Sequence, residues 1–172
     1  MNLAHLHLML NHIPIVGIPV ALVFLIFGIR SKNVPFQRFS LVVIFGLAAV
    51  VLPVYLTGEP AEEVVEHLPG VGESFIETHE GAAKFSLILT LLSGACAFFA
   101  LWFQKNDLKR RWINLGVLAI ATVAFLSLLY TANLGGQIRH TEFRSGATTP
   151  NEGASTTGSD GKGEGDKGGD DD

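Results

Sequence analysis

The sequence predicts an all-α fold: an integral membrane bundle of four helices, with a helical loop between the second and third spans. Two observations predict it. First, 48% of the 172 residues are hydrophobic and the mean hydropathy is +0.39, although the C-terminal segment is very polar. Second, the apolar residues gather in four runs, at 13–29, 39–56, 82–103 and 112–132. Each run is close to the ~20 residues that a helix needs to cross a hydrocarbon core of roughly 30 Å.

The four runs carry almost no charge. Three of them contain no Asp, Glu, Lys or Arg, and the third holds only Lys84, near enough to one end to reach polar surroundings. Four such runs leave no amphipathic face that could meet water. This pattern favours membrane insertion over the buried helices of a soluble protein.

The chain divides into a four-span membrane domain, 1–144, and an acidic tail, 145–172. The tail consists mainly of Gly, Ser, Thr, Asp, Glu and Lys, and this composition buries too little apolar surface to offset the entropy of ordering. We therefore expect the tail to be disordered. It also accounts for the net charge of −4, and no basic patch remains that would indicate nucleic-acid binding.

Cysteine usage excludes several kinds of site. Cys96 is the only cysteine and lies in the middle of the third run. An intrachain disulfide, a zinc site built on cysteines and haem attachment through Cys-x-x-Cys-His are all excluded.

Charge in the connections predicts the orientation. The connections after the first and third runs hold seven of the twelve basic residues: Arg30, Lys32, Arg38, Lys105, Lys109, Arg110 and Arg111. The loop 57–81 has seven glutamates and no Lys or Arg. By the positive-inside rule we expect a multi-pass protein of the bacterial cytoplasmic (inner) membrane. Both termini and the loop 57–81 would face the extracytoplasmic side.

Local signals in the loop 57–81 predict two helix starts. Pro60 fits the first position of a short helix. Ser74 and Glu77 have the spacing of a capping box, which would begin the third long helix outside the hydrocarbon. His79 would then lie on an ordered helix just beyond the membrane boundary.

Proline and glycine predict the ends of the first and last long helices. Pro14 favours a helix start near Asn11 or His12, or a kink. The pair Gly135-Gly136 is predicted to stop the last helix.

The predicted topology puts all six histidines on one side of the membrane: His5, His7, His12, His67, His79 and His140. On a continuous helix His5 and His12 share one face, whereas His7 points nearly opposite and pairs with Asn11. We therefore expect His7 to be solvated or interfacial. His12, at the hydrocarbon boundary, is the most constrained of the first three.

Imidazole is a common ligand of haem iron and of zinc and copper ions. A b-type haem needs two imidazoles on facing helices, and the sequence favours His12 with His79, with His140 as a substitute. Arg139 is the candidate partner for a haem propionate. A tetrahedral metal needs three or four ligands at about 2 Å. The candidate ligands for copper or zinc are His5, His12, His67, His79, His140 and Glu80.

Four short motifs resemble a known family. They are His5…Asn11-His12-Ile13-Pro14, Thr57-Gly58-x-x-Ala61, His79-Glu80 and Gly135-Gly136-x-Ile138-Arg139-His140. Together they resemble a widespread group of small bacterial four-helix membrane proteins without an established function. Relatives in that group are fused to, or lie beside, cytochrome-like domains. The resemblance therefore implies respiratory electron transfer and haem binding.

The residues and the resemblance predict a membrane redox component that binds b-type haem at the outer face. Its partner would be a quinone or an extracytoplasmic cytochrome, and it could form a homo-oligomer or join a larger membrane complex. Two alternatives stay open: a histidine-based copper or zinc protein, and a structural or assembly subunit without a cofactor. No hydrolase or phosphate-loop motif is present, so an electron-transfer or binding component is favoured over a stand-alone catalyst.

Overall fold

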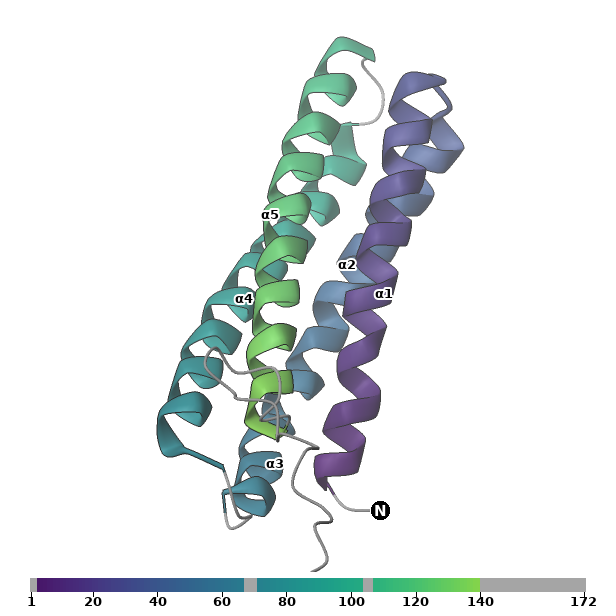
Figure 1. The fold of residues 1–172 in the computed structure, drawn as a ribbon. Helices are drawn as coiled ribbons and strands as arrows, with labels where there is room; N and C mark the ends of the chain where they lie inside the picture. Colours follow the sequence, from purple (N-terminus) through teal and green to yellow (C-terminus); the bar gives the residue numbers. More distant parts are fainter. Residues whose placement is uncertain (1–2, 67–70, 104–106, 140–172) are drawn as a thin grey trace, which may run out of the picture.

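The computed structural model describes residues 3–66, 71–103 and 107–139, and these form a bundle of long helices (Figure 1). The predicted tail, 145–172, lies outside the described residues. The elements are α1 (Leu3–Arg30), α2 (Val34–Leu56), the short α3 (Gly58–Val65), α4 (Glu73–Ala100), a 3₁₀ turn η1 (Leu101–Phe103) and α5 (Asp107–Arg139).

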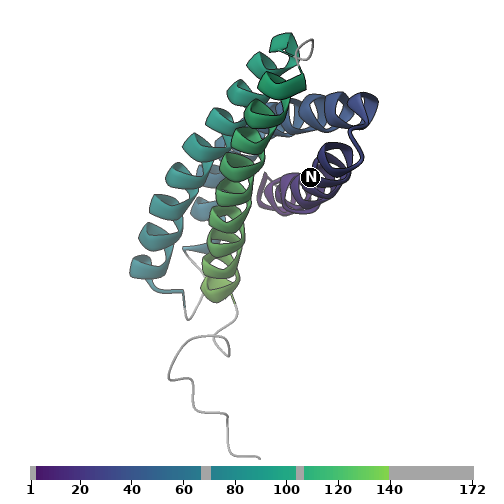
Figure 2. The same ribbon diagram turned by 90° about the horizontal axis from the view of Figure 1, so that it is seen from above.

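The four long helices run alternately up and down. α1 packs against α2, α2 against α4 and α4 against α5, while α5 returns to α1 and closes the ring (Figures 1 and 2). α3 lies at the end of the bundle that holds the N-terminus, against α1 and α2. We call this the histidine end. The opposite end, with the basic connections, is the basic end.

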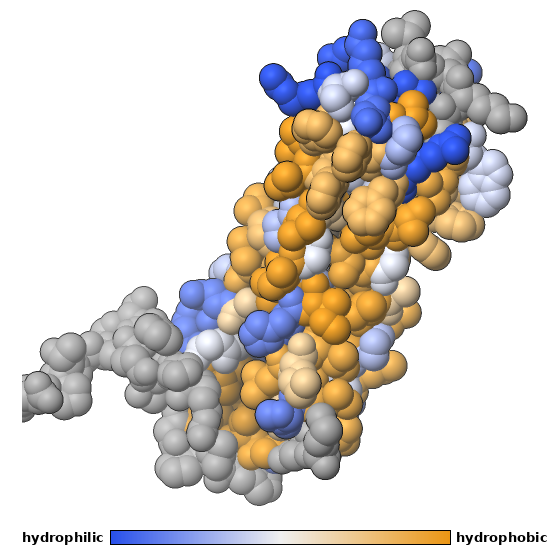
Figure 3. Space-filling model, turned by 90° about the vertical axis from the view of Figure 1, so that its right-hand side faces the viewer, coloured by the Kyte–Doolittle hydropathy of each residue, from blue (hydrophilic) through white to orange (hydrophobic). Residues whose placement is uncertain are grey.

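The surface between the two ends is apolar. The core is built from side chains such as Leu25, Leu41 and Ala121, each 0% exposed. Large apolar side chains also cover the outside, among them Val23 and Ile88, and they form a wide hydrophobic belt (Figure 3). Each predicted run lies within one element, or within α4 and η1 together, and all four helices are long and apolar enough to cross a membrane. The predicted four-helix membrane bundle is confirmed.

Polar side chains join three helices at the basic end. Gln37 Nε2 donates to the carbonyl of Gly28 at 2.8 Å, and Asn114 Nδ2 donates to Gln37 Oε1 at 2.8 Å. Gln37 and Asn114 are buried. Because an unpaired polar group is expensive in an apolar interior, this chain of bonds fixes α1, α2 and α5 relative to one another.

Of the two alternatives predicted from Pro14, the helix start near Asn11 or His12 was wrong, whereas the kink stays a prediction. α1 begins at Leu3 and contains Pro14 and Pro19. A proline inside a helix removes one backbone donor, and the loss is tolerated where neighbouring helices hold the segment. Pro14 is buried in the bundle, so packing outweighs the lost hydrogen bond.

The prediction that Gly135-Gly136 stops the last helix was also wrong. α5 continues to Arg139. Leu134 and Ile138, each 9% exposed, pack in the interior on either side of the glycine pair. Their burial stabilises a turn that two glycines alone would not favour.

Both helix starts in the loop are displaced from the predicted positions. α3 begins at Gly58, two residues before Pro60, directly after α2 ends. α4 begins at Glu73 with Gly72 as its N-cap and without a side-chain capping bond, so the predicted capping box at Ser74 is not used. His79 nevertheless lies on a regular helix, as expected.

Candidate functional site

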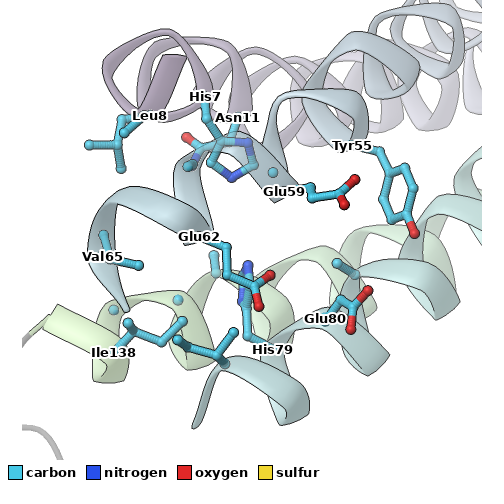
Figure 4. Close-up of a pocket in the computed structure, with 18 of the residues that line it drawn as sticks. His7, Leu8, Asn11, Tyr55, Glu59, Glu62, Val65, His79, Glu80 and Ile138 are labelled. Atoms are coloured by element: carbon cyan, nitrogen blue, oxygen red, sulfur yellow. The ribbon is translucent and has the colours of Figure 1, made fainter. Parts of the chain in front are cut away.

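A cavity of about 580 Å³ opens at the histidine end (Figure 4). Its walls come from the beginnings of α1 and α4, the end of α5, and the α2–α3 junction. Most of the lining is apolar or small, with residues such as Leu8, Ile15, Ala83, Ala132 and Gly135. This volume falls within the ~300–1,000 Å³ that is usual for small-molecule and cofactor sites. We call it the main cavity.

His7 forms part of the cavity wall on α1. Its Nδ1 donates to the carbonyl of Val54 at 3.0 Å, and Thr57 Oγ1 lies 3.2 Å from the same nitrogen. The ring packs over Gly58, where an added Cβ would lie 3.7 Å from Cε1. His7 is therefore half-buried under the α2–α3 junction and not fully solvated, while its place at the membrane interface stays a prediction.

His79 lines the same cavity from α4. Its Nδ1 donates to the carbonyl of Thr131 at 3.0 Å. A Cβ added to Gly135 would lie 3.0 Å from His79 Cε1, so the ring rests directly on the backbone of α5. The glycine pair that was expected to end the helix thus makes room for an imidazole.

The hydrogen bonds set the protonation of both rings. A carbonyl oxygen can only accept, so Nδ1 carries the proton in His7 and in His79. In a neutral imidazole the other nitrogen, Nε2, then keeps its lone pair. Both side chains are half-buried and reach the cavity, and Figure 4 shows them on opposite walls. The site therefore contains two pre-oriented Lewis bases.

Both histidines lie beyond the ends of the apolar runs 13–29 and 82–103. Burial lowers the pKa of His7 below its ordinary value, against a smaller raising effect of the bond to Val54. Burial also lowers the pKa of His79, against the bond to Thr131 and with a further contribution from His7. At neutral pH both rings are therefore neutral and able to bind a metal centre.

Asn11 lies beside His7 on α1 (Figure 4). Its Oδ1 atom is buried and has no hydrogen-bond partner among the described residues. A buried acceptor without a donor costs about 1–3 kcal/mol. The histidine end therefore contains one buried acceptor without a donor among the described residues.

Carboxylates line one side of the main cavity. Glu59 and Glu62 come from α3 and Glu80 comes from α4. Glu80 pairs with Lys84 at 2.8 Å, and both are exposed. Burial, followed by the charges of Glu80, Glu66 and Glu59, raises the pKa of Glu62. This rim is acidic, so it favours a ligand with a positive centre on that side.

The structure separates the predicted site residues. His12 lines the cavity but is exposed, and its Nδ1 donates to Leu8 of its own helix at 2.6 Å. Glu80 and His79 also line the cavity, whereas His5 is exposed and is not among its walls. α5 ends at Arg139, one residue after Ile138 of the cavity wall. His67 and His140 lie outside the described residues.

No group of three or more metal-ligating side chains occurs within residues 3–66, 71–103 and 107–139. The described part of the site offers an opposed pair of imidazoles.

The sequence matches the model of a protein family over residues 4–146, and that family is described as a predicted membrane protein (DUF2231). The chain belongs to this family. The match covers all the helices and the whole main cavity. It confirms the resemblance to a family of small membrane proteins of unknown function. No curated protein and no solved structure matches the chain.

Sequence reasoning missed His7 and Asn11. Helical geometry did place them together, four residues apart on one face. Helical geometry could not predict which segment of the chain packs against that face of α1. Thr57-Gly58, a polar residue and a glycine at the end of an apolar run, was the available signal for a close contact.

Proposed function

We propose that this membrane protein is a redox component that binds b-type haem between His7 and His79. The observation that carries the proposal is the matched pair of half-buried imidazoles, each with Nδ1 held by a carbonyl of another helix and with Nε2 left for a metal. Axial histidines commonly need such a partner on the second nitrogen, because it fixes the ring and raises its basicity.

The walls of the main cavity support a flat, apolar ligand. Gly58 and Gly135 lie against the two rings, and Ala83 and Ala132 add little bulk. The described carboxylates do not suit haem propionates, so the propionates would point away from Glu62, toward the end of α5. Arg139, the last residue of α5, stays the candidate propionate partner from the sequence.

A haem held in this way would supply one-electron chemistry. The residues of the chain orient the imidazoles, keep them neutral and limit access of water. The partner would be a quinone or an extracytoplasmic cytochrome, because the site lies at one end of the bundle. By the positive-inside rule, this end faces outward from the bacterial cytoplasmic membrane.

The pair His7–His79 is favoured over the pair predicted from sequence. His12 is exposed, and its Nδ1 is bonded to its own helix, so no second helix fixes its ring. An axial role for His12, or for His140 as a substitute, stays a prediction.

The test is an absorption spectrum of the detergent-purified chain, oxidised and reduced with dithionite. We expect a Soret band and a sharpened α-band on reduction. Both should be lost in His7→Ala and His79→Ala and kept in His5→Ala, an exposed histidine on the same helix. Retention in His7→Ala with loss in His12→Ala would instead support the pair predicted from sequence.

Elemental analysis separates the two alternatives. A colourless protein with stoichiometric copper or zinc would contradict the haem proposal. It would instead support a metal ion held by histidines and glutamates. A protein with neither colour nor metal would contradict both cofactor proposals and favour a structural or assembly subunit.

The orientation has its own test. In a Cys96→Ala background, a cysteine introduced by Ser74→Cys should react with a membrane-impermeant reagent in intact spheroplasts. A matched cysteine in the basic connection, Ser31→Cys, should react only after lysis. The reverse pattern would overturn the outward placement of the histidine end.

A further inference from the structure

A second, smaller cavity of about 70 Å³ lies deeper in the bundle than the main cavity. The two cavities share His7, Asn11 and His79 in their walls. The smaller one continues toward Ser86 and Thr131, below the histidine layer. We call it the inner chamber. A cavity needs roughly 10–15 Å³ of such space to hold one water molecule, so the inner chamber is large enough for ordered water.

Asn11 Oδ1 gives the inner chamber an unsatisfied acceptor. This atom is buried and has no partner among the described residues. Asn11 lines the chamber together with Pro14, one turn further along α1.

Hydroxyl groups supply further partners for water. Ser86 Oγ lies 2.9 Å from Thr131 Oγ1, and Thr131 Oγ1 donates to the carbonyl of Ser127 at 3.0 Å. Since the proton of Thr131 is committed, Ser86 donates to Thr131, and each oxygen keeps a lone pair that can accept from water. A buried water needs two to four polar partners, and the inner chamber provides them.

We propose that the inner chamber binds ordered water that donates a hydrogen bond to Asn11 Oδ1 and bridges it to the Ser86–Thr131 hydroxyl pair. The bound water removes the cost of the orphan acceptor. It also gives the main cavity a hydrated inner wall. The assignment does not depend on what fills the main cavity.

Pulsed X-ray hydroxyl-radical labelling, read by mass spectrometry on the full chain in detergent, tests the proposal. Radicals formed from bound water label the side chains beside it. Leu128 lines the inner chamber and is only 9% exposed, so we expect it to be labelled. Leu25, 0% exposed in the core and absent from the walls of both cavities, is the matched control and should stay unlabelled.

Asn11→Leu removes the acceptor and should lower the labelling of Leu128 several-fold. Ser86→Ala removes a second partner and serves the same purpose if the first variant does not fold. Labelling of Leu128 no higher than that of Leu25 in the native chain would show a dry chamber and overturn the proposal. Unchanged labelling of Leu128 in a folded variant would overturn the role of the residue removed.

The absorption spectrum tests the haem proposal. The labelling of Leu128 tests the proposal of ordered water in the inner chamber. The two results are independent, because labelling can be measured on colourless protein.

Discussion

The two ends of the bundle differ in whether their buried polar groups have hydrogen-bond partners. At the basic end, Gln37 and Asn114 are buried and bonded to each other, and Gln37 is also bonded to Gly28. At the histidine end, Asn11 Oδ1 has no partner among the described residues, and His7 and His79 line a cavity with only Nδ1 held by a backbone carbonyl. The closed network holds helices together, whereas the open one leaves polar groups that a bound molecule could satisfy.

Asn114→Leu should produce the largest loss of stability. It leaves Gln37 Oε1 buried without this donor, which costs about 1–3 kcal/mol of unfolding free energy. Unfolding by SDS titration in detergent measures the loss. Asn11→Leu, the counterpart at the histidine end, should cost much less because it removes an acceptor that has no partner among the described residues. Equal losses would mean that the two ends do not differ.

Gly28→Ala should have the next largest effect. The added Cβ would lie 2.9 Å from the backbone nitrogen of Gln37, which cannot move without shifting α2. Overpacking of this kind costs about 1–3 kcal/mol, partly offset by the better helix propensity of alanine. Gly136→Ala at the histidine end meets nothing within 4 Å, so the same SDS titration should show no loss or a gain of up to about 1 kcal/mol.

Stability should also depend on pH through the histidine end. Burial lowers the pKa of His79 in the folded chain, so its contribution is present above the ordinary value of 6.5 and is lost as the pH falls through the folded value. The thermal midpoint in detergent should therefore fall on acidification below about pH 6.5. His79→Gln should reduce this pH dependence, while the exposed His5→Gln should leave it unchanged. An unchanged slope in His79→Gln would contradict the burial of a neutral ring.

The smallest effect is expected for Glu62→Gln. Burial and neighbouring glutamates raise the pKa of Glu62, so its charged form is disfavoured in the folded chain at neutral pH. The substitution should raise the thermal midpoint slightly at pH 7 and leave it unchanged well below the ordinary value of 4.5. Glu63→Gln, an exposed neighbour outside the cavity walls, is the control. A larger gain from Glu63→Gln would contradict this account.

The sequence could predict the long helices because a membrane-spanning helix must contain a long, nearly uncharged apolar run. Four runs of about 20 apolar residues each admit few other structures. Prolines and glycines were poorer guides. The rules applied to Pro14 and Gly135 describe an isolated helix, in which either residue favours a break. In the bundle, packing of the neighbouring side chains stabilises the helix enough to offset that preference. The tertiary contacts of Leu134 and Ile138 are not visible in local sequence.

The site could be predicted only in part, for a related reason. His79 was expected to lie on an ordered helix, and it does. Ranking His7 below His12 assumed that the face of α1 carrying His7 meets solvent or headgroups. Only the return of the chain at Thr57-Gly58 covers that face, and no periodicity in the first helix encodes where the second helix ends.

The junction at Thr57 links the cover of the main cavity to one of its histidines. Thr57 ends α2 and precedes α3, and His7 Nδ1 reaches both its hydroxyl and the carbonyl of Val54. The two groups that hold His7 Nδ1 therefore sit where α2 ends and α3 begins, so any change in the angle of that junction would change the hydrogen bonds that orient this imidazole.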